Sequence, residues 1–212
     1  MAKVISKQNA IEKIQSNQRV FVHGAATTPS VLLQELVMQA SRLKNVELIH
    51  MHTHGHAEYA QAKFAQNFKV SNLFVGPNMR QHFDFDQVDY IPCFLSEIGI
   101  LFRSGIRKPD VALIHISPPD RHGYCSLGTS VDVVKAAIET SDLVIAQVNP
   151  RVPRVFGDGV FHSSQIDFMV EVDEPLFTSE SKAPSQVEKQ IGKNVAELIE
   201  DGATLQMGIG SI

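Results

Sequence analysis

Apolar residues along the chain change repeatedly between two spacings, and this change predicts an α/β fold. Short apolar runs predict buried strands at 19–23, 46–51, 69–75, 88–91, 110–116 and 142–148. Between them, apolar residues recur every three or four positions, which predicts helices at 10–16, 28–40, 95–102 and 131–140. Strands separated by helix-length segments indicate β-α-β units and therefore an open, mainly parallel sheet with helices on both faces.

The helix predicted at 28–40 has clear start signals. Thr28 is a suitable N-cap, and Pro29 stands in the first turn, where proline is best tolerated. The stripe expected to face the core contains Leu32, Leu33, Leu36, Val37 and Ala40.

Ligands of open parallel sheets bind beyond the carboxyl ends of the strands. In this chain four loops follow predicted strands and are the places to look for a site. They span residues 23–29, 50–59, 117–128 and 149–162.

Composition narrows the class of protein. Hydrophobic residues make up 43% and charged residues 20% of the 212 positions, typical of a globular protein rather than a disordered one. The net charge of −4 provides no basic field for nucleic acid or an anionic membrane.

No apolar run approaches the ~18 residues of a membrane span. The N-terminus lacks the apolar core of a signal peptide, and Cys93 and Cys125 are far apart, so we expect reduced thiols in a cytoplasmic protein.

An internal similarity suggests a second, incomplete unit. Residues 12–22 resemble residues 197–207, and both segments predict a helix, a polar turn and a strand. A polar segment at 178–185 is typical of a linker, and a helix is predicted at 187–200. We therefore expect one domain at 1–180 and the linker, helix and first strand of a truncated second domain at 181–212. The alternative is a native end with a docked or disordered tail.

Four alternating histidines raise the question of a metal. His50, His52, His54 and His56 would share one face of a strand, and Glu58 could complete a zinc site in a hydrolase. The run leaves the strand by Gly55, so the alternative is a polar pocket wall at the carboxyl end of the strand.

Two further clusters have both a chemical and a structural explanation. In the segment 120–125, His122 could activate Cys125 as a nucleophile, but neighbours this close in sequence more often form a structured turn. Arg151 and Arg154 could meet an anionic ligand or form a surface or dimer salt bridge.

Near the end of the chain, Gly208-Ile209-Gly210 follows an apolar run. Such a turn lets backbone N–H groups approach a phosphate or oxyanion, although it also occurs as a simple tight turn. The sequence contains no P-loop, no GxSxG elbow and no complete GxGxxG motif.

Taken together, these segments resemble the acetyl-CoA hydrolase/transferase family, especially its 4-hydroxybutyrate and butyryl-CoA:acetate CoA-transferases. The resemblance runs in the same order along nearly the whole chain. It is carried by Ser117-Pro118-Pro119-Asp120, Gly123, Leu127-Gly128, Ser130-Val131-Asp132, Val148-Asn149, Pro153, Gly157-Asp158, His162, Ile166-Asp167 and residues 198–212.

The resemblance implies a NagB/RpiA/CoA-transferase-like fold, with the active site in a cleft between two such domains. It also implies a homodimer, no bound cofactor or metal, and a coenzyme A thioester as substrate. Coenzyme A would pass by ping-pong chemistry between a short-chain acyl-CoA (4-hydroxybutyryl-, butyryl- or acetyl-CoA) and a carboxylate such as acetate, through a glutamyl-CoA intermediate.

In one respect the sequence departs from the family pattern. The nucleophilic glutamate of the family lies in a G-x-H-[S/T]-E segment after the glycine turn, and this segment is absent here, so no catalytic residue is assigned. The residues that match the coenzyme A contacts are Gly208, Ile209, Gly210, Ser211 and Ile212. By fold position alone, the predicted substrate pocket contains Thr27, Thr28, Ser117 and Pro118. An acyl-CoA hydrolase, or a non-catalytic subunit that needs a partner chain, remains an alternative.

Overall fold

A computed structural model describes residues 2–82, 84, 86–178, 183–206 and 208 of the chain. It divides into two units, residues 1–177 and 178–212. Within the described residues, every helix is too short or too polar to cross a bilayer.

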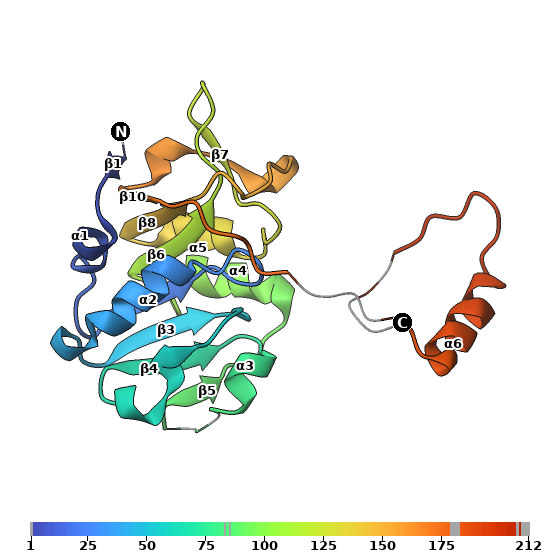
Figure 1. The fold of residues 1–212 in the computed structure, drawn as a ribbon, viewed down its shortest axis with the longest axis horizontal. Coiled ribbons are helices and arrows are strands. Elements are labelled where there is room, and N and C mark those ends of the chain that lie inside the picture. Colours follow the sequence, from blue (N-terminus) through green and yellow to red (C-terminus); the bar gives the residue numbers. More distant parts are fainter. Residues whose placement is uncertain (1, 83, 85, 179–182, 207, 209–212) are drawn as a thin grey trace. The chain divides into compact units, whose positions relative to one another are not determined.

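The first unit is built on one parallel sheet of eight strands (Figure 1). The order across the sheet is β1-β10-β8-β6-β2-β3-β4-β5, and every neighbouring pair is parallel. Its strands are β1 (Lys3–Val4), β2 (Arg19–Val22), β3 (Val46–His50), β4 (Phe68–Asn72), β5 (Val88–Tyr90), β6 (Val111–Ile116), β8 (Leu143–Val148) and β10 (Phe168–Glu171). The predicted open parallel sheet is confirmed.

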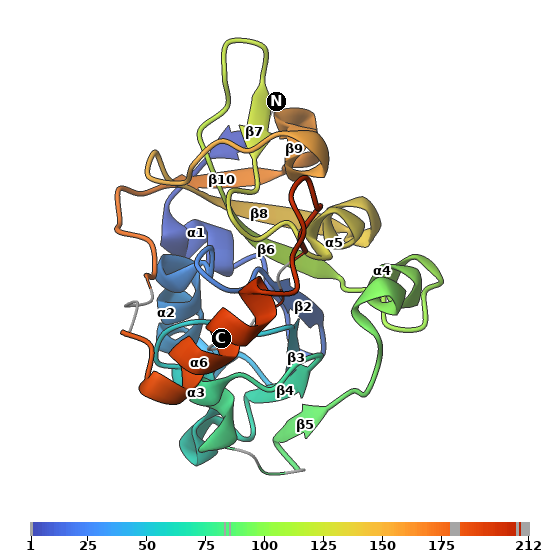
Figure 2. The same cartoon turned by 90° about the vertical axis from the view of Figure 1, so that its right-hand side faces the viewer.

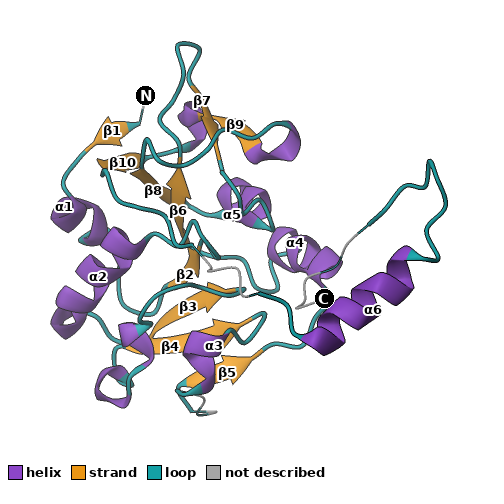
Figure 3. Cartoon of the chain, turned by 45° about the vertical axis from the view of Figure 1, so that its right-hand side comes forward, coloured by secondary structure: helices purple, strands orange, loops and turns teal. Residues whose placement is uncertain are grey.

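Helices cover both faces of this sheet, as predicted. The helices are α1 (Lys7–Ile11), α2 (Ser30–Met38), α3 (Pro77–Arg80), α4 (Leu95–Arg103), α5 (Val134–Thr140) and, in the second unit, α6 (Gln186–Ala196). Figure 3 shows α1 and α2 on one side of the sheet and α4 and α5 on the other.

The two faces bury separate apolar cores because side chains alternate along a strand. In β2, Val20 and Val22 pack into the core beneath α1 and α2, whereas Phe21 packs into the core beneath α4 and α5. Along β6, Leu113 joins the first core, and Ile114 the second. The β-strands are therefore apolar on both faces, which explains their nearly continuous hydrophobic runs.

Several predicted boundaries need correction. The first helix starts at Lys7, because the Ser6 hydroxyl accepts the N–H of Asn9 and caps it, and it ends at Ile11. Residues 12–16 therefore form a turn rather than a helix. In the second unit α6 ends at Ala196, and residues 203–206 form no strand, so the predicted helix–turn–strand repeat is not formed there.

The N-cap of α2 was also predicted wrongly. Pro29 occupies the cap position, and the Thr28 hydroxyl instead donates to the Ala25 carbonyl at 2.8 Å. The N–H groups of Val31 and Leu32 are satisfied by the Gln147 side-chain oxygen, from β8. A residue more than a hundred positions away thus replaces the local cap.

A small antiparallel sheet of two strands lies outside the main sheet. It is formed by β7 (Tyr124–Ser126) and β9 (Val160–His162), and Figure 2 shows the loop before β7 projecting beyond the sheet. Neither strand was predicted, and the edge strand β1 and its neighbour β10 were also missed.

Candidate functional site

The strand order places the expected site at one point of the sheet. From β2 the chain proceeds to β3, β4 and β5 on one side, whereas β6, β8 and β10 lie on the other. The loops that leave β2 and β6 therefore diverge, and such a switch point opens a crevice at the carboxyl edge. This edge contains an unusual set of buried polar side chains, at the end of the strand or directly after it: His23, His50, Asn72, His115, Gln147 and Asn149.

His115 is the centre of one buried network. Its Nε2 accepts hydrogen bonds from the side-chain amides of Asn149 at 3.1 Å and Gln147 at 3.3 Å. With Nε2 as acceptor, Nδ1 carries the proton and donates to the Thr28 carbonyl at 3.3 Å. Burial lowers the pKa of His115 to about 4, so the ring is neutral at pH 7. The network joins β6 and β8 to the loop after β2.

His23 holds the same loop from its other side. Its Nδ1 accepts the backbone N–H of His115 at 3.2 Å, and Nε2–H donates to the Ser130 carbonyl at 2.6 Å. The Thr27 hydroxyl lies 2.9 Å from Nε2 and donates to the Gly24 carbonyl. Burial lowers the pKa of His23 to about 4. The predicted site residue Thr27 is therefore fully buried, and its hydroxyl holds the loop after β2 against the His23 ring.

The loop after β2 follows a strained path. Ala25 has a φ of +49°, a left-handed conformation that residues other than glycine rarely adopt. Its N–H donates to the His52 carbonyl at 2.8 Å, and a Cβ on Gly24 would lie only 2.6 Å from the same oxygen. Strain of this kind persists where surrounding structure imposes it, often at functional sites.

A pocket of about 260 Å³ opens between this loop, α2 and the segment after β3. We call it the α2 pocket. Its lining residues are Thr28, Ser30, Leu33, Gln34, Val37, His54, Gly55, His56, Ala57, Glu58, Tyr59 and Phe177. Of the four residues predicted for a substrate pocket, Thr28 lines this pocket, whereas Thr27, Ser117 and Pro118 do not.

The histidine run contributes a pocket wall. β3 ends at His50, so the run leaves the strand at once and the four rings do not share a strand face. His54 and His56 line the α2 pocket, which confirms the pocket-wall interpretation. His50 is buried, and its Nε2 accepts the Tyr59 hydroxyl at 3.2 Å. Among the residues that the structure describes, no group of three or more potential ligands could hold a metal ion.

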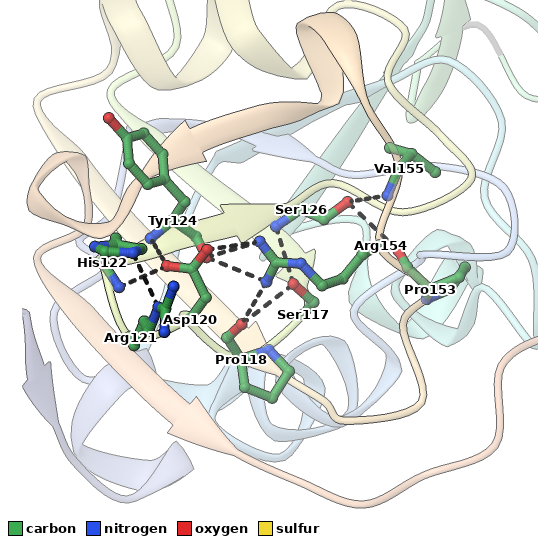
Figure 4. A network of polar contacts seen from close by, with 10 residues as sticks. All are labelled: Ser117, Pro118, Asp120, Arg121, His122, Tyr124, Ser126, Pro153, Arg154 and Val155. Atoms are coloured by element: carbon green, nitrogen blue, oxygen red, sulfur yellow. Dashed lines mark hydrogen bonds and ion pairs between the residues drawn. The ribbon is translucent and has the colours of Figure 1, made fainter.

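The segment 117–126 forms a structured turn (Figure 4). Asp120 Oδ1 accepts the N–H groups of His122 and Tyr124, each at 2.9 Å. The Arg154 guanidinium pairs with Asp120 Oδ2 at 3.2 Å and donates to the Tyr124 and Pro118 carbonyls. The salt-bridge explanation of Arg154 is confirmed, and Arg151 likewise pairs with Asp173 at 2.6 Å.

Ser117 and Cys125 serve this turn. The Ser117 hydroxyl accepts the Ser126 N–H at 2.9 Å and is itself buried, so its oxygen is already used by the backbone. Burial raises the pKa of the Cys125 thiol to about 11. A buried, protonated thiol is a poor nucleophile. The structured-turn interpretation is therefore confirmed and a Cys125–His122 pair is not formed. Both cysteines are free.

The predicted coenzyme A segment belongs to the second unit. Gly208 is exposed and has open space around the position of a Cβ. The predicted contacts Ile209, Gly210, Ser211 and Ile212 lie outside the described residues.

Comparison with known proteins now assigns the family. Residues 1–178 match the model of the acetyl-CoA hydrolase/transferase N-terminal domain. The chain belongs to the acetyl-CoA hydrolase/transferase family. It is 41% identical to the 4-hydroxybutyrate coenzyme A transferase of Clostridium kluyveri over 99% of this chain and 49% of that protein. It is 43% identical to the succinyl-CoA:acetate/propanoyl-CoA:succinate CoA transferase of Fasciola hepatica over 94% of this chain and 42% of that protein.

Solved structures agree with the acetyl-CoA hydrolase/transferase assignment. A 4-hydroxybutyrate CoA-transferase from Porphyromonas gingivalis has a TM-score of 0.79 at 34% identity, and it is covered over 49% of its length. RipA from Yersinia pestis has a TM-score of 0.90 at 26% identity, with 51% covered. In both cases 99% of this chain is aligned. The chain spans about half the length of these relatives.

The buried polar side chains at the carboxyl edge of the sheet, from His23 to Asn149, are called the buried polar belt below. The sequence did not indicate most of them. His23 and His115 are polar residues at or near the end of apolar runs, which is the signal that could have marked them; His23 was included as the first residue of the loop 23–29, and His115 was not considered. Gln147 and Asn149 lie at the end of the next strand and carry the same signal.

Proposed function

We propose that this chain is the N-terminal part of a CoA-transferase that moves coenzyme A between a short-chain acyl-CoA and a free carboxylate such as acetate. The observation that carries the proposal is the 41% identity to a 4-hydroxybutyrate coenzyme A transferase over 99% of the chain. The matched region contains the α2 pocket and the buried polar belt at the carboxyl edge of the sheet.

The proposed chemistry needs a glutamate that lies beyond this chain. Its carboxylate attacks the thioester carbonyl of the acyl-CoA and expels the coenzyme A thiolate, which leaves an acyl-glutamyl anhydride. The thiolate then attacks the glutamyl carbonyl of the anhydride, releases the acyl group as its carboxylate, and leaves a glutamyl-CoA thioester. A second carboxylate reverses these steps and leaves as the new acyl-CoA. The glycine turn at residues 208–212 would provide N–H groups for coenzyme A or an oxyanion.

This first unit would contribute shape rather than a nucleophile. Its His23 and His115 rings are neutral, and both nitrogens of each ring are hydrogen-bonded. The two rings therefore fix the loop after β2 and do not accept protons from a substrate. The α2 pocket would receive the acyl chain.

The second unit supports a longer protein. α6 exposes Val187, Ile191 and Val195, which are spaced by four residues and form one apolar stripe. An amphipathic helix normally buries such a stripe against another element. We propose that the part of the protein carrying the glutamate covers it, and that the whole protein forms a cytoplasmic homodimer.

The test uses the full-length protein with butyryl-CoA and acetate. Transfer produces acetyl-CoA and butyrate, and butyryl-CoA alone should leave coenzyme A covalently attached to the protein, visible in the intact mass. Release of free coenzyme A at the same rate with and without acetate would favour the hydrolase instead. Analytical ultracentrifugation of the same sample measures the oligomeric state.

The intact mass of the natural polypeptide separates the remaining alternative. A mass near twice 23.4 kDa is expected for a protein with both halves in one chain. A mass of 23.4 kDa would instead indicate a subunit that needs a partner chain to supply the glutamate.

A further inference from the structure

The charges around the α2 pocket are unevenly distributed. Its polar lining residues are Thr28, Ser30, Gln34, His54, His56 and Tyr59, and its acidic lining residue is Glu58. Among the described lining residues there is no lysine or arginine. A carboxylate bound here would meet no permanent positive charge and would lie near a second carboxylate.

The helix end beside the pocket does not compensate. The N-terminus of a helix can bind an anion through its unpaired N–H groups. In α2, however, the Gln147 side-chain oxygen already accepts from Val31 and Leu32, at 3.1 and 3.4 Å. The Ser30 N–H is directed to the Thr28 carbonyl, and the Leu33 N–H to that of Pro29. The donors of the first turn are therefore used within the protein.

Of the two histidines in this wall, His54 is weakened as a cation. Burial, with a smaller contribution from the neighbouring His52, lowers the pKa of His54 below its ordinary value. Burial therefore disfavours the charged form of the His54 ring.

The rest of the lining suits a short hydrocarbon chain. Leu33, Val37, Ala57 and Phe177 provide an apolar surface, and the 260 Å³ volume is below the ~300–1,000 Å³ typical of pockets for drug-sized ligands. The hydroxyl of Ser30 and the amide of Gln34 provide neutral hydrogen-bonding groups.

From these contacts we infer that the α2 pocket selects acyl groups with an uncharged chain, such as butyryl or 4-hydroxybutyryl, and rejects those that end in a second carboxylate, such as succinyl. The inference rests on the proposed CoA-transferase function and adds the substrate class. Similarity does not decide this point, because relatives named for 4-hydroxybutyrate and for succinyl-CoA are 41% and 43% identical to the chain.

The first test compares acyl donors with the full-length protein and acetate as acceptor. The ratio of kcat/KM for butyryl-CoA to that for succinyl-CoA should be at least about 100, because a site without a partner for a polar group discriminates strongly against it. Equal efficiency with both donors would overturn the selectivity while leaving the proposed function intact. Absence of transfer from every acyl-CoA would overturn the function and the selectivity together.

A charge introduced into the pocket gives a second, independent readout. Gln34→Arg should raise the succinyl-to-butyryl ratio of kcat/KM by about tenfold, equivalent to ~1.4 kcal/mol. Gln34 is an exposed position on α2, so the larger side chain is accommodated. The matched control is Gln165→Arg, which adds the same charge at an exposed site outside the pocket and should leave the ratio unchanged. Equal ratios in the two variants would overturn the assignment of the pocket.

Discussion

At the scale of single residues, the carboxyl edge is held together by neutral histidines. His23, His50 and His115 are buried at the ends of β2, β3 and β6, and burial lowers each pKa to about 4. Every ring has hydrogen-bond partners at both nitrogens. Such a network orders the loops around it only while the rings stay uncharged.

The free energy of unfolding should therefore fall in mild acid. The unfolded state takes up protons on these histidines near pH 6.5, whereas the folded state does so only near pH 4. Their contribution is fully present above pH 6.5 and is lost as the pH falls toward 4. With three rings, the expected slope near pH 5 reaches ~4 kcal/mol per pH unit, measured by urea unfolding.

Single substitutions measure how much each histidine contributes to the slope of the free energy of unfolding against pH. His115→Gln should reduce it by about a third, since one of the three groups is removed, whatever its effect on stability at pH 7. The control is His122→Gln at an exposed position, which should leave the slope unchanged. An unchanged slope in the His115 variant would mean that this ring is not buried in its neutral form.

The buried side chain of Gln147 should contribute strongly to the free energy of unfolding. Its oxygen caps α2, and its NH₂ group donates to His115. Gln147→Leu removes the acceptor of the Val31 and Leu32 N–H groups, whereas His115 keeps its hydrogen bond from Asn149, so we expect a loss of about 2 kcal/mol in the free energy of unfolding. Gln165→Leu, at an exposed position, should change it by less than ~0.5 kcal/mol. Similar losses in the two variants would contradict the cap.

At the scale of elements, the loops after β2 and β3 are packed directly on each other. Gly24 lies against the His52 backbone, and an added Cβ would approach the carbonyl oxygen to 2.6 Å. A backbone atom cannot rotate aside as a side chain can. The position of His54 and of the pocket wall therefore depends on a residue that has no side chain.

Gly24→Ala should separate the two loops. We expect a loss of about 2 kcal/mol in the free energy of unfolding and reduced transferase activity in the full-length protein. Gly192→Ala on α6 is the matched control, because nothing lies within 4 Å of its Cβ position. There the change should raise helix content, since glycine costs a helix about 1 kcal/mol relative to alanine. A stable and active Gly24→Ala protein would contradict the close packing.

At the scale of the whole molecule, the two units differ in how they are stabilised. Both apolar cores lie within residues 2–172, whereas α6 has no buried residue. A chain ending at Phe177 should therefore unfold with the same free energy as residues 1–212, within ~0.5 kcal/mol. Urea unfolding of the two chains measures this. A large loss on truncation would show that residues 178–212 stabilise the sheet.

The sequence alone determined the layered architecture. Nearly continuous apolar runs at 19–22, 111–116 and 143–148 are typical of strands buried on both faces, and helical spacing between them favours parallel crossovers. These signals are local, so they survive without tertiary information. The two-residue edge strand β1 is too short to carry such a signal, and in β10 only Met169 and Val170 are fully buried, so neither strand stands out in the sequence.

The candidate site depended on contacts that are distant in sequence. Thr28 has the residue type of an N-cap, but Gln147 takes that role because β8 places its amide at the start of α2. Ser117 has a hydroxyl that could meet a substrate, and in the structure this hydroxyl accepts the N–H of Ser126 in β7. Local preference predicted what each residue can do. Only the tertiary structure decided which partner it meets, because hydrogen bonds at the carboxyl edge join residues as far as 116 positions apart.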